Sequence, residues 1–112
     1  MIVQFIQYIG CILTAAVGAL SLFAPNKIVG FTGLAAQGPR GITEIRALLG
    51  GLFIALGVGP FFLGNVAYTF LGVCYLVIGI VRLPSIFFDR SGSGSNWASL
   101  VFELFFGVIF IL

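Results

Sequence analysis

Four long runs of apolar residues cover most of the chain, and short segments rich in Gly, Pro and polar residues separate them. Within each run the apolar residues are continuous rather than alternating with polar ones, which favours helices over strands. A helix needs about 20 mostly apolar residues to cross the hydrocarbon core of a bilayer. We therefore predict an all-α fold, an integral membrane four-helix bundle with spans over residues 3–23, 43–63, 66–87 and 97–112.

The three connections between these runs differ in length and composition. Residues 24–42 are the longest connection and mix Gly and Pro with apolar side chains, which predicts a short interfacial helix near 26–31. The second connection is a tight turn at Gly64, and the third, over 88–96, is a polar loop containing DRSGSGSN. We expect residues 1–112 to form one transmembrane domain.

The composition agrees with a membrane protein. Hydrophobic residues make up 61% of the chain and charged residues only 7%, whereas soluble domains have about 25% charged residues. The net charge of +2 is too small to indicate nucleic-acid binding. The chain has no histidine, and no cluster of Cys, Asp or Glu has the spacing of metal ligands, so we expect neither a metal site nor a cofactor.

The basic residues predict the orientation in the membrane. Lys27, Arg40 and Arg90 lie on the first and third connections, whereas the second turn and both ends carry no basic side chain. Cytoplasmic loops are enriched in Lys and Arg. We therefore expect the loops 24–42 and 88–96 to be cytoplasmic and both termini to lie outside, in a bacterial inner membrane or its equivalent.

Small and polar residues predict which helix faces pack together, because they allow close approach and hydrogen bonds between membrane helices. In the first helix they recur every three or four residues, at Gln4, Gln7, Cys11, Thr14, Gly18 and Ser21. In the second helix small residues recur every four residues, at Ala47, Gly51, Ala55 and Gly59. We expect both stripes to face the bundle.

Three charged residues fall inside the predicted spans: Arg46, Arg82 and Glu103. Because successive helices alternate in direction, all three lie on the cytoplasmic side, roughly 5–10 Å below the interface at about 1.5 Å per residue. Glu103 is expected to accept hydrogen bonds from Arg82, Arg46 or both. Tyr75 shares a helix face with Arg82, and Gly79 lies one turn away, leaving space beside it.

This cluster has two interpretations. It can be an ion network that holds three helices together. Alternatively, two arginines against one glutamate leave a positive charge, which a lipid phosphate, a carboxylate or a quinone carbonyl can balance. A proton path is less favoured, because no second acid or histidine lies deeper in the membrane.

Glu44 is expected to lie apart from Arg46, although only two residues separate them. Two residues along a helix correspond to a rotation of about 200°, so the two side chains point in opposite directions. Glu44 therefore is predicted to stay near water, with Arg40 or the interfacial loop as its partner. Gly50 and Gly51 are expected to leave room beside Arg46.

Three short motifs carry a resemblance to a known group of proteins. The segment EIRALLGGLFIALG contains R-A-x-x-G-G, GIVRLPSIFFD carries Arg82, and FELFFG carries Glu103 followed by Leu104. The chain resembles the small four-helix membrane proteins of the DoxX/DoxD-like superfamily, in a domain-of-unknown-function branch. The resemblance implies a left-handed four-helix bundle without an established activity. A distant relative is a membrane subunit of a thiosulfate:quinone oxidoreductase, which favours a quinone slightly.

These observations rank the expected functions. The first is a non-enzymatic membrane protein that binds a lipid, a quinone or another amphiphile at the Arg/Glu cluster. The alternative is an accessory subunit of a larger respiratory or photosynthetic membrane complex, or a homo-oligomer, docking through its glycine-rich and aromatic faces. The weakest alternative is an enzyme, such as the membrane subunit of a quinone-linked oxidoreductase, because no nucleophile–base pair is present.

Overall fold

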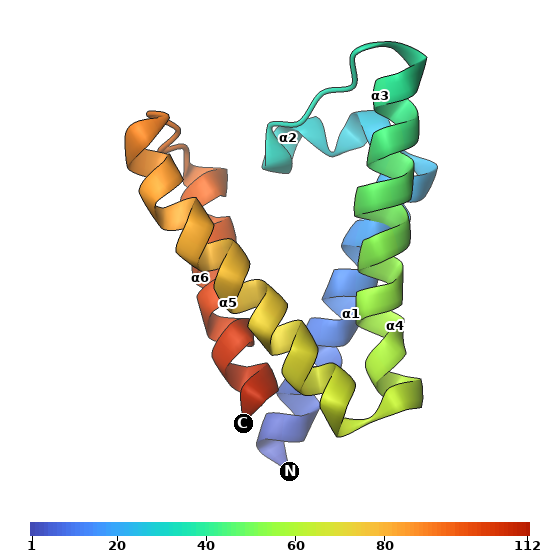
Figure 1. Ribbon diagram of the computed structural model, residues 1–112, viewed down its shortest axis with the longest axis vertical. Helices are drawn as coiled ribbons and strands as arrows, with labels where there is room; N and C mark the ends of the chain where they lie inside the picture. Colours follow the sequence, from blue (N-terminus) through green and yellow to red (C-terminus); the bar gives the residue numbers. More distant parts are fainter.

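The structure is a computed structural model that describes residues 1–112, and Figure 1 shows its helices in chain order. The first membrane helix is α1 (Ile2–Phe23), and the third and fourth are α5 (Asn65–Phe88) and α6 (Gly94–Ile111). The second is continuous over Gly38–Leu63. It consists of α3 (Gly38–Glu44), the π-helical segment η2 (Ile45–Leu52) and α4 (Phe53–Leu63).

All four of these helices are long and apolar enough to cross a membrane, which confirms the predicted fold class. Large apolar side chains face outwards along them; Phe62 is 82% and Phe88 86% exposed. Two helices begin more than one residue earlier than predicted, at Gly38 rather than 43 and at Gly94 rather than 97. The second begins at Gly38, because Pro39 suits the first turn of a helix. The chain is a multi-pass integral membrane protein.

The helices are arranged as two pairs that meet at one end and diverge at the other (Figure 1). In the first arm, α1 packs along η2 and α4; in the second arm, α5 packs along α6. We call the end that holds both termini and the Gly64 turn the closed end. The open end holds the connection between α1 and α3 and the connection between α5 and α6.

The closed end is held together by aromatic packing and by two polar contacts between the arms. A buried cluster joins α1 to α5 and α6, and it consists of Cys11, Leu71, Tyr75, Phe106 and Phe110. The Gln7 amide donates to the carbonyl oxygen of Ile109 at 2.8 Å. The Tyr75 hydroxyl bonds to the Thr14 hydroxyl. These aromatic and polar contacts between the arms all lie outside the open end.

The predicted packing face of the first helix is confirmed from Cys11 to Ser21, although Gln4 is exposed, and that of the second helix is wrong. Cys11, Thr14, Gly18 and Ser21 of α1 are buried. Ala47, Gly51 and Ala55 are exposed, and a Cβ atom on Gly51 or Gly59 would meet nothing within 4 Å.

Gly50 and Gly57 face α1 instead, seven residues apart, which matches the seven-residue repeat of α1. A Cβ atom on Gly57 would lie 2.6 Å from the backbone nitrogen of Ala15 and 2.6 Å from the carbonyl oxygen of Cys11. Ala47 and Gly51 lie within the π-helical segment η2, whose turns are wider than the 3.6 residues of an α-helix. The four-residue stripe therefore does not stay on the contact, whereas Gly50 and Gly57 lie on it.

Two short helical pieces lie at the open end, η1 (Pro25–Lys27) and α2 (Val29–Thr32), in the region predicted to hold an interfacial helix. Ile28 between them is fully buried. Figure 1 shows α2 lying across the gap between the arms, and α2 contacts α6. The first connection therefore reaches from the first arm to the second.

We expect Gly57→Ala to destabilise the protein by about 1–3 kcal/mol, because the added methyl group would overlap backbone atoms of α1 that cannot rotate away. The matched control is Gly51→Ala on the same membrane helix, where the added methyl group meets open space and should change stability by less than about 0.5 kcal/mol. Thermal unfolding in mild detergent, followed by circular dichroism, measures both. Equal melting temperatures for the two variants would contradict this contact.

Candidate functional site

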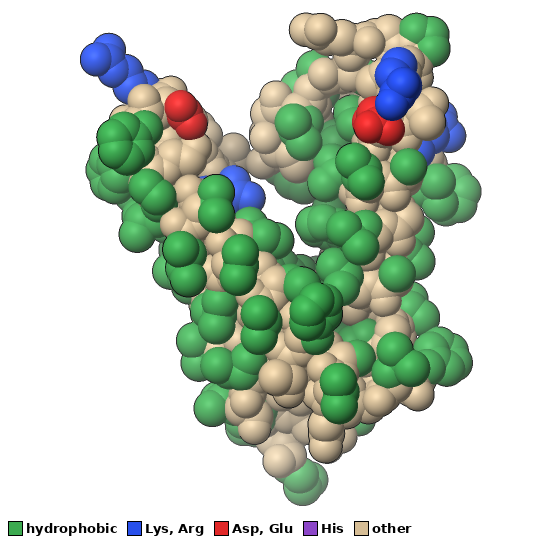
Figure 2. Space-filling view, viewed as in Figure 1, with side chains coloured by type: hydrophobic (Ala, Val, Ile, Leu, Met, Phe, Trp, Pro, Cys, Tyr) green, Lys and Arg blue, Asp and Glu red, His purple; other side chains and the backbone are tan.

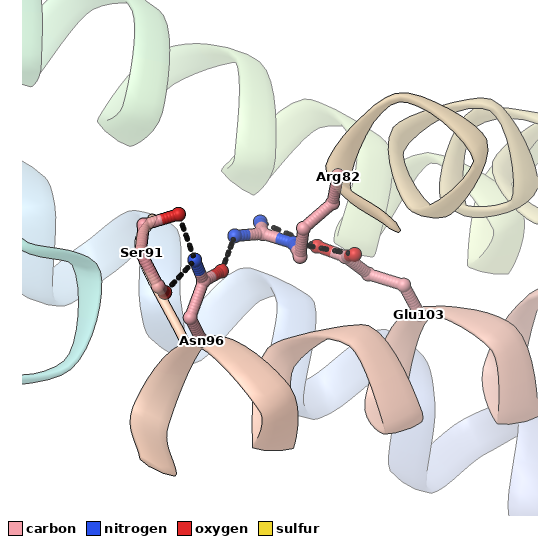
Figure 3. Close-up of polar contacts among 4 residues, drawn as sticks. All are labelled: Arg82, Ser91, Asn96 and Glu103. Atoms are coloured by element: carbon pink, nitrogen blue, oxygen red, sulfur yellow. Dashed lines mark hydrogen bonds and ion pairs between the residues drawn. The ribbon is translucent and has the colours of Figure 1, made fainter. Parts of the chain in front are cut away.

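A buried ion pair joins the two helices of the second arm. Arg82 of α5 donates from Nε to Oε1 of Glu103 at 2.8 Å and from Nη2 to Oε2 at 2.7 Å (Figure 3). This two-bond geometry is the strongest arrangement for a guanidinium and a carboxylate. Glu103 on α6 is only 6% exposed, whereas the Arg82 side chain keeps 31% of its surface exposed. Glu103 is thus enclosed and Arg82 faces the open end.

A short chain of hydrogen bonds connects this pair to the loop between α5 and α6. Arg82 Nη1 donates to Oδ1 of Asn96 at 2.7 Å. The Asn96 amide in turn donates to the carbonyl oxygen of Ser91 at 2.8 Å and to its hydroxyl at 3.1 Å (Figure 3). Three of the five N–H groups of Arg82 are used in this way, which leaves two for another acceptor.

Gly79 brings the two helices of the second arm close enough for this pairing. A Cβ atom at Gly79 would lie 3.0 Å from Cδ2 of Leu104 on α6. Because Gly79 has no side chain, Leu104 of α6 fits against α5 at this point, one turn before Arg82. The predicted free space beside Arg82 is filled by α6 rather than left for a ligand.

A polar pocket of about 640 Å³ lies at the open end, beside the ion pair. Phe31, Thr32 and Gly33 form one wall, at the end of α2. Arg82, Arg90 and residues of the loop between α5 and α6 form the other wall, and Phe31 is the one hydrophobic residue in the lining. Figure 2 shows the hollow between the arms and basic and acidic side chains gathered toward the open end.

A second, smaller pocket of about 380 Å³ adjoins the ion pair along α5. Val77, Ile78 and Val81 give it an apolar lining. Arg82 and Asn96 line both pockets. The polar pocket and the apolar groove therefore have Arg82 in common.

Arg46 does not join Arg82 and Glu103, contrary to the predicted cluster of three. Its side chain is exposed on η2, and it forms neither an ion pair nor a side-chain hydrogen bond. Arg46 belongs to the first arm and Arg82 to the second, and the arms diverge at the open end. Nor do the glycines leave a space beside Arg46: Gly50 packs on Leu22, and Gly51 faces outwards.

Glu44 and Tyr75 also lie away from the pair. Glu44 lies 3.8 Å from Nε of Arg40, one helical turn earlier, and exposed pairs of this kind contribute about 0–1 kcal/mol. Tyr75 is buried at the junction of the arms, where its ring stacks on Phe110 with 6.0 Å between the ring centres. Because the Thr14 hydroxyl donates to the carbonyl of Gly10, the Tyr75 hydroxyl is the donor to Thr14.

Sequence reasoning missed two residues of the site. Asn96 lies at the end of a glycine- and serine-rich run that was interpreted as a polar loop, but it is in the first turn of α6. The Ser93 hydroxyl accepts from the backbone nitrogen of Asn96 at 3.3 Å and so caps this helix. Arg90 was used only as a topology signal. A serine three residues before the asparagine is the sequence signal that could have placed the helix start there.

One protein family matches nearly the whole chain. Residues 2–112 match the family described as Domain of unknown function (DUF4345). The chain belongs to the DUF4345 family. No curated protein and no solved structure gave a match. The match confirms the prediction of a domain of unknown function.

We expect Arg82→Met to destabilise the protein by about 3–5 kcal/mol, because it leaves the enclosed Glu103 carboxylate without a partner. Adding Glu103→Leu to the same chain should restore most of that loss, since no buried charge then remains. Unfolding by sodium dodecyl sulfate in mixed micelles, followed by circular dichroism, measures the free energies of unfolding of the unmodified protein, of each single variant and of the double variant, which together form a double-mutant cycle.

Arg46→Ala is the control for this cycle. Because Arg46 is exposed and forms no pair, its replacement should change stability by less than about 0.5 kcal/mol. A loss of stability as large as that of Arg82→Met would indicate that Arg46 does pair with Glu103. A double variant no more stable than Arg82→Met would contradict the pairing of Arg82 with Glu103.

Proposed function

We propose that this protein is a non-enzymatic membrane protein that binds an amphiphile in the space between its arms. The observation that carries the proposal is that Arg82 lines both the polar pocket and the apolar groove. An amphiphile consists of a polar head and an apolar chain, which correspond to the polar pocket and the apolar groove. Its head would accept from the two free N–H groups of Arg82, and its chain would follow Val77, Ile78 and Val81.

The charges of the site support a ligand that accepts hydrogen bonds or carries negative charge. Glu103 neutralises Arg82. Arg90 also lines the polar pocket and has no acidic partner, and no Asp or Glu lines this pocket. The unbalanced positive charge, which the sequence suggested would come from Arg46, therefore comes from Arg90. A phosphate, a carboxylate or a quinone carbonyl fits this lining.

The distribution of charge supports an orientation with the open end in the cytoplasm and both termini outside. The eight charged side chains lie on the two connections of the open end or in the adjoining turns of the helices: Lys27, Arg40, Glu44, Arg46, Arg82, Asp89, Arg90 and Glu103. Five are basic and three acidic. An excess of basic residues is typical of the cytoplasmic side, so the pocket would open at the level of the inner-leaflet head groups of a bacterial inner membrane or its equivalent.

Membership of the DoxX/DoxD-like superfamily stays a prediction, supported by the motifs around Arg46, Arg82 and Glu103. Under that prediction a quinone is one candidate amphiphile. The structure adds a separate reason to keep it, because a quinone carbonyl is an acceptor for the free N–H groups of Arg82. A role as the membrane subunit of a quinone-linked oxidoreductase is the least favoured version.

A second candidate function, an accessory subunit or a homo-oligomer, is favoured by one observation. The small residues Ala47, Gly51 and Ala55 are exposed on one helix of the first arm, and no helix of this chain packs against Gly51. Small residues on an exposed membrane helix allow close approach of another helix. This face is separate from the amphiphile site, so one protein can both bind an amphiphile and associate with another membrane helix.

We expect Val81→Trp to abolish retention of the amphiphile, because the indole would fill the groove along which the ligand chain leaves Arg82. The measurement is native mass spectrometry of the protein purified in mild detergent, in which the unmodified protein should carry an adduct of lipid or quinone mass.

Val73→Trp is the matched control, on the same helix and also exposed, but outside both pockets. It should keep the adduct, which separates a specific site from lipid carried over around the whole protein. Absence of any adduct on the unmodified protein, or equal retention by both Trp variants, would contradict the proposed function.

A further inference from the structure

We infer that the head group bound in the polar pocket is a phosphoryl group, held between Arg82 and Arg90 with the serine hydroxyls of the loop between α5 and α6. This inference rests on the proposed function and narrows its ligand class. It uses the donors of the pocket, the residue at position 90 and the position of the pocket relative to the apolar groove.

The pocket has more hydrogen-bond donors than a carbonyl or a carboxylate needs. Arg82 retains two N–H groups after pairing with Glu103 and Asn96. Arg90 forms no ion pair and no side-chain hydrogen bond, so its five N–H groups are free. A quinone carbonyl has one oxygen and a carboxylate two, whereas a phosphate has four, of which two carry the charge in the diester of a phospholipid and three are free in a monoester. Two guanidinium groups with planar, forked donors suit that geometry.

The serines of the loop add donors of a second kind. Ser91 accepts from the Asn96 amide, and Ser93 accepts from the Asn96 backbone nitrogen. Ser91 keeps its hydrogen for another acceptor, whereas the Ser93 and Ser95 hydroxyls lie 3.3 Å apart and one of them donates to the other. Both serines line the pocket together with Ser95. The lining therefore offers charged and neutral donors on the same side, as phosphate sites in proteins do.

The backbone at Arg90 is unusual for its residue type. Arg90 has a φ of 51°, and it is the one non-glycine residue of the chain with a positive φ. It directly follows Asp89, which caps α5, at a position where glycine is the favoured residue. A non-glycine residue in this conformation is strained, and such residues cluster at functional sites. The positive charge at position 90 gives a reason for an arginine where the backbone favours glycine.

The location of the pocket makes a lipid head group or free phosphate the source of the phosphoryl group. The polar pocket opens beside the loop of the open end, and the apolar groove leads from Arg82 along α5 towards the closed end. A phospholipid would place its phosphate in the pocket and its acyl chain in the groove. Free phosphate would occupy the pocket alone.

The test is titration of the purified protein in mild detergent with two lipids of identical acyl chains and with a short-chain quinone, followed by native mass spectrometry. Phosphatidylglycerol carries a phosphate, diacylglycerol does not, and a short-chain quinone represents the carbonyl alternative. We expect phosphatidylglycerol to bind at least about tenfold more tightly than diacylglycerol or the quinone, the effect of one charge-assisted contact.

Arg90→Gln and Arg46→Gln form the matched pair of variants. Both remove one positive charge from an exposed arginine at the open end, but Arg46 lines neither pocket. Arg90→Gln should weaken phosphatidylglycerol binding about tenfold, and Arg46→Gln should leave it unchanged. Equal effects of the two variants would show that Arg90 acts only through the net charge of the protein, and would overturn the inference.

Adding millimolar inorganic phosphate to the titration distinguishes a lipid head group from free phosphate as the source of the phosphoryl group. Competition with phosphatidylglycerol would support a site that takes free phosphate as well, and absence of competition would support a site that needs the lipid. Equal binding of diacylglycerol and phosphatidylglycerol would overturn the phosphoryl inference. If Val81→Trp still removed the bound amphiphile in that case, the proposed function would stand without it.

Discussion

A carboxylate enclosed between two membrane helices has to be neutralised, and the arrangement of the open end follows from that requirement at Glu103. A charged group at depth in a membrane costs several kcal/mol unless it is paired. Arg82 supplies the pair, and its two bonds fix the orientation of the guanidinium. Asn96 then holds the third donor of Arg82 and ties the pair to the loop through Ser91. The ion pair thus positions the loop whose side chains line the polar pocket.

The divergence of the arms follows from where close packing and polar contacts are available. In lipid, apolar side chains gain little by leaving the surrounding acyl chains for one another, so helices associate through close packing and hydrogen bonds. Gly57 provides such packing within the first arm, and the contacts of Gln7 and Tyr75 join the arms at the closed end. Towards the open end, Glu103 is satisfied within the second arm by Arg82. That pair therefore gives no attraction to the first arm, and a space between the arms results.

The membrane helices could be predicted from the sequence because long apolar runs depend on composition and length alone. The pairing of Arg82 with Glu103 could also be anticipated, because their depths agree and their helices are joined by a short loop. Depth does not specify the direction of a side chain around its helix or the angle between helix pairs, and for that reason Arg46 was placed wrongly. Asn96 was missed because helix capping by a serine within a polar run leaves only a weak local signal.

Selectivity for an amphiphile in this protein has to come mainly from the head group. A ligand chain that moves from the bilayer into a lipid-facing groove exchanges one apolar environment for another and gains little free energy. The head group exchanges water for the donors of Arg82, Arg90 and the serines, in a pocket without acidic residues. Because the wall opposite these donors is formed by Phe31 and Thr32 at the end of α2, a bound head group would touch both the second arm and the connection that comes from the first arm. Binding at this point would add to the contact that α2 already makes with α6, and a ligand that binds only the folded protein would stabilise it by RT ln(1 + [L]/Kd).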